Sequence, residues 1–141
     1  MTDLEPSHHI FRHVGGASID GDFIDPAAFR RKRKEHGQIE EGLSVNWVEY
    51  FHKPTAQEAI PSLRDVFDKK GCKVGSKSKF ALLNVGAAKA AAMKYATVDI
   101  VLDEKDDDRS HSLVKGYEAL NEQVAEELAG VIIAAYPANP R

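Results

Sequence analysis

The pattern of hydrophobic and polar residues along the chain predicts four β-strands, at 9–14, 43–51, 78–86 and 97–103. The segment 43–51 is the clearest, because its odd-numbered positions are mostly apolar and its even-numbered positions begin with the polar residues Ser44 and Asn46. Such alternation buries one face of a strand, so we expect Ser44 and Asn46 to lie on the face turned away from the main core. The segment 78–86 is almost continuously apolar, which is typical of a central strand.

Helix-terminal signals and helix propensity predict three helices before residue 100. In 25–37, Asp25 can cap the helix, the proline that follows suits the first helical position, and a glycine can end it. The sequence TAQE at 55–58 is a capping box, but Pro61 follows it. Either a single turn precedes a helix that begins at Pro61, or one helix is distorted there. The alanine-rich segment 87–95 has a high helix propensity.

The longest predicted helix lies at the C-terminal end. Apolar residues recur every three or four positions from Leu113 to Ala135, as in an amphipathic helix. We therefore predict an α+β fold in which about four strands form a sheet and the long amphipathic C-terminal helix packs on it. We expect a flexible lead-in at 1–8, a single globular domain at 9–135 and a tail at 136–141.

Composition and charge narrow the function classes. The 141 residues are 43% hydrophobic and 29% charged, which is typical of a globular domain. The net charge of −3 argues against a nucleic-acid-binding protein, which usually carries a basic surplus. We find no run of about 18 apolar residues that could span a membrane and no apolar segment of a secretory signal at the start. We therefore expect a cytoplasmic protein.

No motif for a cofactor or a metal site is present. The chain lacks the phosphate-loop, dinucleotide-binding, nucleophile-elbow and HExxH patterns. The aspartates at 106–108 could bind a hard cation, but carboxylates before a predicted helix are explained by its positive end. The histidines His8, His9 and His13 do not supply three convergent ligands from one strand face. We therefore expect no cofactor and no metal.

The most interesting titratable residue is His111, which stands between Ser110 and Ser112. It falls at the start of the predicted C-terminal helix, where backbone N–H groups favour anions and either serine can cap. A histidine there, flanked by two hydroxyls, could bind a phosphate or carboxylate or transfer a proton, and Ser110 and Ser112 are candidate ligand-binding residues beside it. The alternative is a surface histidine at a helix edge with no such role.

Two functional hypotheses follow from these residues. In the first, Arg12, Ser44, Asn46 and His111 surround an anionic ligand, such as a phosphate or nucleotide, in a binding protein or enzyme. Arg12 points to an anionic ligand because a charged residue inside a strand either faces solvent or contacts an anion or carboxylate. The hypothesis requires these four side chains to lie close together.

In the second hypothesis the protein is a non-catalytic partner of another protein, for example one half of a bacterial two-protein system. The basic segment 30–36 and the acidic segment 103–108 would then contact oppositely charged surfaces. We favour this hypothesis at the level of sequence, because no catalytic motif is present.

The order of several short segments resembles a group of small uncharacterised bacterial proteins. The segments are HIFRHV, DPAAF, LSV and SHSLVKG, and together they extend over most of the chain. The resemblance implies no activity, because none is known for that group. It draws attention to five residues: Arg12, Phe29, Ser44, His111 and Gly116.

Overall fold

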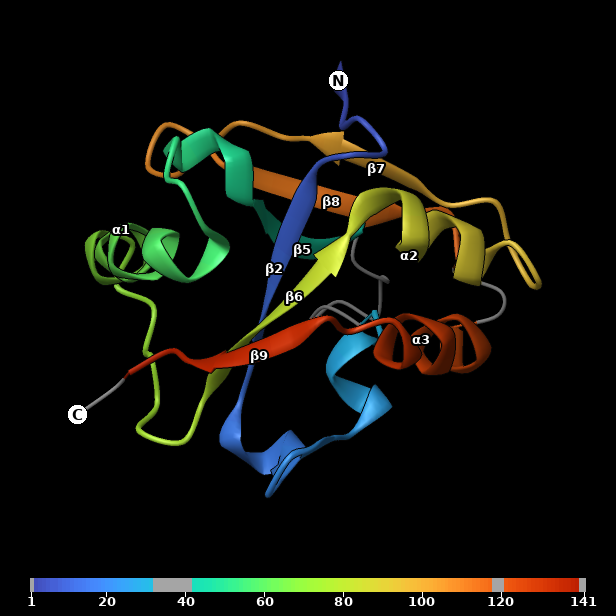
Figure 1. The fold of residues 1–141 in the computed structure, drawn as a ribbon, viewed down its shortest axis with the longest axis horizontal. Helices are drawn as coiled ribbons and strands as arrows, with labels where there is room; N and C mark the ends of the chain where they lie inside the picture. Colours follow the sequence, from blue (N-terminus) through green and yellow to red (C-terminus); the bar gives the residue numbers. More distant parts are fainter. Residues whose placement is uncertain (1, 32–41, 118–120, 140–141) are drawn as a thin grey trace, which may run out of the picture.

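A computed structural model describes residues 2–31, 42–117 and 121–139. Within these residues the fold is α+β, with one seven-stranded antiparallel sheet and one short hairpin (Figure 1). The strands of the larger sheet are, in spatial order, β1 (Thr2–Asp3), β7 (Asp99–Leu102), β8 (His111–Lys115), β5 (Leu43–Trp47), β2 (His9–Val14), β6 (Lys79–Asn84) and β9 (Ala134–Pro137). The hairpin consists of β3 (Ile19–Asp20) and β4 (Phe23–Ile24).

Helices lie on both faces of the sheet. Figure 1 shows α1 (Ala56–Lys69) on one side, and α2 (Val85–Ala92) and α3 (Asn121–Gly130) on the other. Three short 3-10 helices complete the described structure: η1 (Gly16–Ser18), η2 (Pro26–Phe29) and η3 (Val48–Phe51). Among the described helices, none combines the length and the apolar character that a membrane crossing requires.

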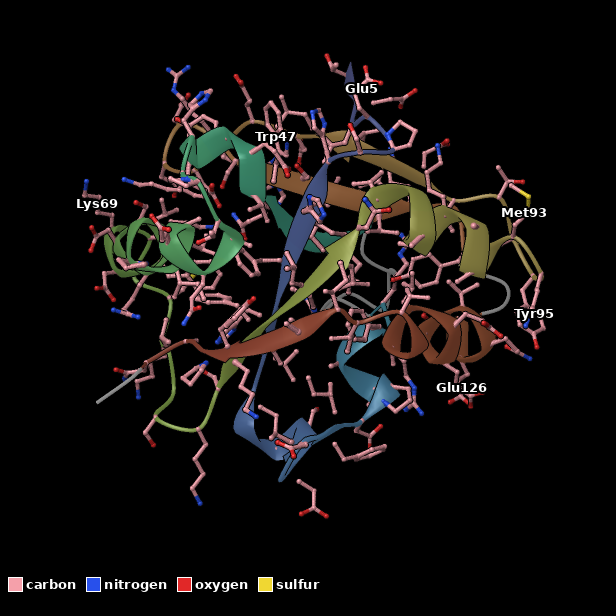
Figure 2. The ribbon with its side chains drawn as sticks, in the orientation of Figure 1. Glu5, Trp47, Lys69, Met93, Tyr95 and Glu126 are labelled. Carbon is pink, nitrogen blue, oxygen red and sulfur yellow. The ribbon has the colours of Figure 1, made fainter. Side chains whose placement is uncertain are left out.

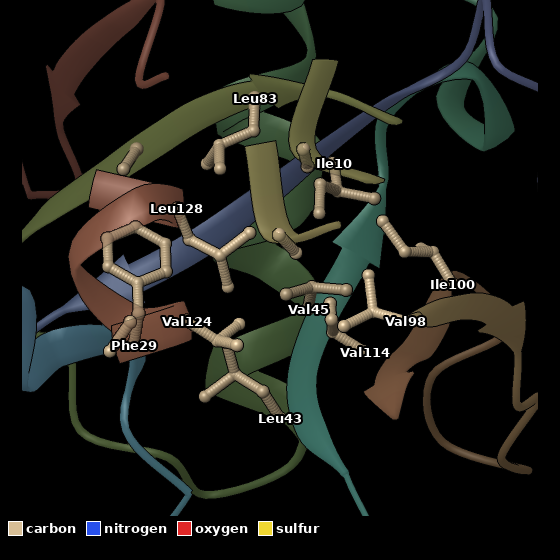
Figure 3. Packing of buried hydrophobic residues seen from close by; sticks show 14 of the residues in the cluster. Ile10, Phe29, Leu43, Val45, Leu83, Val98, Ile100, Val114, Val124 and Leu128 are labelled. Carbon is tan, nitrogen blue, oxygen red and sulfur yellow. The ribbon is translucent and has the colours of Figure 1, made fainter. Parts of the chain in front are cut away.

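The hydrophobic core has two parts, one on each face of the sheet. The larger part joins strand residues such as Leu43, Val45 and Ile100 to Val124 and Leu128 of α3 (Figure 3). The smaller part packs apolar residues of β2 and β6 against α1, and contains Phe11, Ala59, Leu63, Phe67, Phe80 and Leu82. The apolar face of β5 therefore turns toward the larger core, as the alternation predicts, and Ser44 and Asn46 face the α1 side.

The helix α1 is continuous through its proline. The hydroxyl of Thr55 accepts a hydrogen bond from the backbone N–H of Glu58 at 3.2 Å, so the capping box begins the helix. Pro61 lies inside the helix rather than at its start. Of the two alternatives that the sequence left open, the single helix is therefore the observed one.

The predicted helix at 25–37 is wrong over its described part. Asp25 caps as expected, accepting from the N–H of Ala27 at 2.9 Å, but only the 3-10 helix η2 follows and Arg30 is extended. Tertiary pairing explains the difference, because the Asn121 side chain bonds both the N–H and the carbonyl of Arg31. Residues 32–37 lie outside the described residues.

The predicted C-terminal helix is also wrong in extent. Residues 111–115 form β8, the described part of α3 is Asn121–Gly130, and the chain then enters β9. Gly116 breaks the helical pattern, since its φ of 103° favours glycine and a Cβ there would lie 2.7 Å from the carbonyl oxygen of Thr97. The sheet has seven strands rather than four because β8 and β9 come from the segment predicted as helix or tail and β1 comes from the predicted lead-in.

Residues at both ends of the described chain belong to the folded structure. Thr2 and Asp3 pair with β7, and Leu4 is buried in the larger core. Near the other end, Ala138 is buried beside α1. The predicted lead-in and tail therefore each contribute residues to the sheet or the core.

Candidate functional site

A pocket of about 590 Å³ opens where β2 and β5 separate. The two strands pair only at Ile10 with Trp47 and Phe11 with Asn46, although β2 continues to Val14. The segment containing η1 and η2 forms one wall, and the end of α1 contributes Phe67 and Lys70. The polar side chains in its lining include Arg12, His13, Ser44, Asn46, Lys70 and His111.

Four of the residues singled out in the sequence line this one pocket. Arg12, Ser44, Asn46 and His111 come from β2, β5 and β8, which are neighbours in the sheet. The closeness that the ligand hypothesis requires is therefore present. The predicted helix start at His111 is wrong, because this residue begins the strand β8.

Ser110 and Ser112 do not line the pocket. Both residues are fully buried, and neither caps a helix, because a strand follows them. The hydroxyl of Ser110 donates to Asp108, and that of Ser112 donates to the carbonyl oxygen of Ser110. They support the lining from behind, and the prediction that either serine caps a helix is wrong.

Arg12 spans the gap between the separating strands. Its Nε donates to the carbonyl oxygen of Ala28 at 2.8 Å, and its Nη1 donates to that of Ser44 at 2.9 Å. The Ser44 carbonyl belongs to the part of β5 that no longer pairs with β2. The guanidinium thus satisfies backbone acceptors at the gap and brings a positive charge into the pocket lining.

His111 lies between an acid and a hydroxyl. Its Nδ1 is 3.1 Å from the carbonyl oxygen of Asp103 and 3.2 Å from Asp103 Oδ2, and its Nε2 is 3.3 Å from Ser44 Oγ. Because a carbonyl oxygen can only accept, the neutral ring carries its proton on Nδ1. Nε2 is then the acceptor, and the Ser44 hydroxyl donates to it.

Asp108 lies behind the pocket and fixes two lining residues. Its fully buried carboxylate accepts from Lys70 Nζ at 2.9 Å, from Asn46 Nδ2 at 2.8 Å, and from the N–H and hydroxyl of Ser110 at 3.1 and 2.7 Å. Burial alone would raise the pKa of Asp108, but the hydrogen bonds from Lys70, Ser110 and Asn46 outweigh it and hold the pKa below its ordinary value. Lys70 and Asn46 are therefore oriented by an ionised carboxylate.

His13 also lines the pocket. Its ring packs against Phe67 and Phe80, with centroids 5.3 and 5.4 Å away. Burial lowers its pKa, and the positive charge of Arg12 lowers it further. Its buried Nε2 has no hydrogen-bond partner among the described residues. The ring therefore adds a neutral surface to the pocket.

Sequence reasoning missed Lys70, Asp103 and Asp108 as parts of the site. The sequence predicts Asp108 as a cation ligand or a charge before a helix, and as part of the acidic surface 103–108, but not as a buried partner of Lys70 and Asn46. No local signal distinguishes these residues, because their roles depend on how α1 and the β7–β8 connection lie against β5. Among the described residues no group of three His, Cys, Asp or Glu side chains could hold a metal ion.

The two charged segments proposed for protein contact are partly used inside the fold. In 30–36 only Arg30 and Arg31 are described, and Arg31 is buried over the ring of Tyr117. The rest of that segment lies outside the described residues. In 103–108, Asp103 contacts His111 and Asp108 is buried, which leaves Glu104, Asp106 and Asp107 as the exposed acids.

Comparison with protein-family models, with curated proteins and with solved structures finds no match. The resemblance to small bacterial proteins therefore stays a prediction. The geometry of the pocket is the basis on which a function can be proposed.

Proposed function

We propose that this protein binds a small molecule with a phosphate or carboxylate group in the pocket between β2 and β5. The observation that carries the proposal is the charge of the lining. Arg12 and Lys70 both bring cations to it, and none of the described lining residues is acidic. A pocket of about 590 Å³ lies within the range of small-molecule sites.

The arrangement supports an anion rather than a cation or an apolar ligand. Asp108 balances much of the charge of Lys70, and the guanidinium of Arg12 brings a second positive charge to the lining. His111 and Ser44 add polar groups on the same face of the sheet. Hydrogen bonds to a charged group contribute about 1.5–3 kcal/mol each, so two such contacts suffice for a specific orientation.

Thermal unfolding with a panel of inorganic phosphate, pyrophosphate, adenosine nucleotides and citrate tests the proposal. A ligand at about one hundred times its Kd stabilises the folded protein by roughly 2.7 kcal/mol, which raises Tm by several degrees. We expect at least one anion to raise the Tm of the wild type. If none does so at millimolar concentration, the proposal is wrong.

Two substitutions that each remove one positive charge show where the anion binds. Arg12→Gln removes the cation in the pocket, whereas Lys69→Gln removes one on the exposed side of α1, where Figure 2 shows Lys69 at the outer edge of the molecule. The anion-dependent shift in Tm should be retained in Lys69→Gln and lost in Arg12→Gln. Equal shifts in both variants would place the anion elsewhere and contradict the proposal.

The partner-protein hypothesis remains a second prediction with less support. Two of the acids in 103–108 are engaged within the fold, and Arg31 of 30–36 is buried, so the described parts of both segments offer less surface charge than the sequence indicated. Reversing the charge of Glu104, Asp106 and Asp107 together would test it. A partner that depends on this surface should lose binding, while the Tm shift with anions should persist.

A further inference from the structure

Three side chains in and behind the pocket wall form a line of contacts. Ser44 Oγ lies 3.3 Å from His111 Nε2, and His111 Nδ1 lies 3.2 Å from Asp103 Oδ2. This is the order of nucleophile, base and orienting carboxylate that activates a serine hydroxyl. We propose that Ser44 is the nucleophile of a hydrolytic reaction in which His111 is the general base and Asp103 is a positioning residue.

The backbone of the sheet holds these three residues in place. In the β5–β8 ladder Asn46 pairs with His111 and Ser44 pairs with Leu113, so Ser44 and His111 are diagonal neighbours on one face. The N–H of Asp103 donates to the carbonyl oxygen of His111 at 2.8 Å, which fixes the third position. A site built on paired strands keeps its geometry better than one built on loops.

The contacts of the two ring nitrogens of His111 favour the neutral tautomer that the reaction needs. Nδ1 faces two oxygen acceptors from Asp103, one of which is a backbone carbonyl. The neutral ring therefore presents its lone pair at Nε2, toward Ser44 Oγ. The contact of 3.3 Å is slightly longer than a reacting hydrogen bond, as is common in sites without a substrate. Asp103 also stabilises the imidazolium once His111 has taken a proton.

The reaction that fits is hydrolysis of an ester. Ser44 Oγ bonds to the carbonyl carbon and passes its proton to His111 Nε2. The bond to the leaving alcohol then breaks, and His111 returns the proton to the departing oxygen. Water attacks the resulting acyl-serine with His111 again as base, the bond from Ser44 Oγ to the acyl carbon breaks, and a carboxylic acid leaves while the hydroxyl is restored.

The charge of the pocket identifies the class of ester. Arg12 donates to the backbone carbonyl of Ser44 at 2.9 Å, so its positive charge lies next to the nucleophile. A cation at this place stabilises the negative charge that develops on the ester oxygen. This part of the inference rests on the proposed function: if the pocket binds an anion, the substrate is an ester whose acid or alcohol part carries a phosphate or carboxylate.

A fluorophosphonate probe tests the nucleophile without knowledge of the substrate. Attack by Ser44 forms a bond from Oγ to phosphorus, fluoride leaves, and His111 takes the serine proton. Intact mass and peptide mapping of the wild type should show one adduct, at Ser44. Absence of an adduct at Ser44 overturns the inference.

Matched variants test whether the probe labels Ser44 because His111 activates its hydroxyl, or only because the serine is accessible in the pocket. Ser18 also lines the pocket but has no hydrogen bond to a histidine among the described residues, so Ser18→Ala should be labelled like the wild type and Ser44→Ala should not be labelled. His111→Gln should be labelled at least roughly tenfold more slowly, because general base catalysis typically contributes about 10²–10⁴-fold. An unchanged rate in His111→Gln contradicts the proposed base.

Asp103→Asn tests the positioning residue. Its backbone carbonyl is retained and still accepts from Nδ1, so long-range ¹H–¹⁵N NMR of the His111 ring should show the same tautomer as in the wild type. The labelling rate should nevertheless fall at least about tenfold, because the imidazolium loses its carboxylate. A rate equal to that of the wild type contradicts the role of Asp103.

The outcomes also distinguish this inference from the proposed function. If an anion raises Tm but Ser44 forms no adduct, the pocket binds a ligand and the reaction is wrong. If Ser44 forms the adduct but no anion in the panel raises Tm, the reaction stands and the anionic class of ligand is wrong.

Discussion

Asp108→Asn should destabilise the protein by about 3 kcal/mol. The carboxylate accepts from Ser110 through Oδ1 and from Asn46 and Lys70 through Oδ2. An amide keeps one oxygen, and its NH₂ group then faces two donors that lose their acceptor. Breaking a buried ion pair typically costs about 3–5 kcal/mol. We expect the lower end of this range because the Lys70 side chain is 19% exposed and can turn toward water.

Chemical denaturation by urea at pH 7 measures this difference, and Asp107→Asn is the matched control. Asp107 is exposed and undergoes the same change of charge one residue away, so its variant should unfold within about 0.5 kcal/mol of the wild type. An Asp108→Asn variant that is as stable as the control would refute the view that a buried, ionised network orients the pocket.

The difference in the free energy of unfolding between the wild type and Asp108→Asn should also depend on pH, which tests the lowered pKa of Asp108. The folded-state pKa of Asp108 is below its ordinary value of 3.8, so the carboxylate stabilises the fold above that pH. The contribution is lost as the pH falls from about 4 through the folded-state pKa, because protonation removes the charge. The stability gap between the wild type and Asp108→Asn should therefore narrow below about pH 4. A gap that widens in acid contradicts the lowered pKa.

Two further predictions concern local structure that supports the site. Gly116→Ala should lower the free energy of unfolding in urea by about 1–3 kcal/mol, because its φ is 103° and the new Cβ would lie 2.7 Å from the Thr97 carbonyl oxygen. A Cβ at Gly130 meets no atom within 4 Å, so the control Gly130→Ala should not destabilise the protein. Equal losses in the two variants would contradict the steric explanation. Thr55→Ala should lower the free energy of unfolding by about 1 kcal/mol, since it removes the cap of α1, while Thr55→Ser should retain most of it. A loss of similar size in both Thr55 variants would argue against the cap.

The sequence predicts those elements whose signals are local. The strand at 9–14 agrees with β2, and the capping box begins α1. The alternation in 43–47 places Ser44 and Asn46 on the face opposite the larger core, but the predicted strand is wrong over 48–51, which form η3. These features depend on neighbours along the chain, so one sequence is enough to find them.

The sequence fails where tertiary contacts decide. Leu113 and Tyr117 are spaced as in a helix, yet β8 pairs with strands on both sides and Gly116 ends it in a conformation no helix allows. The short edge strands β1 and β9 exist because they pair with longer neighbours. Their few residues carry no strand pattern of their own.

The site shows the same division. The alternation in the sequence predicts the polar face of β5. The sequence also predicts a functional role for His111, but at the start of a helix, whereas the residue begins the strand β8. Lys70, Asp103 and Asp108 could not be placed, because they reach the pocket from segments whose packing the pattern does not encode.

Amide NMR of the wild type, titrated with inorganic phosphate and pyrophosphate, is the first experiment to decide whether the pocket between β2 and β5 binds an anion. If an anion binds in the pocket, saturable shifts should be concentrated at amides that line it, such as those of Gly15, Ser18 and Cys72. Saturable shifts confined to other surfaces, or none up to millimolar concentration, would contradict it.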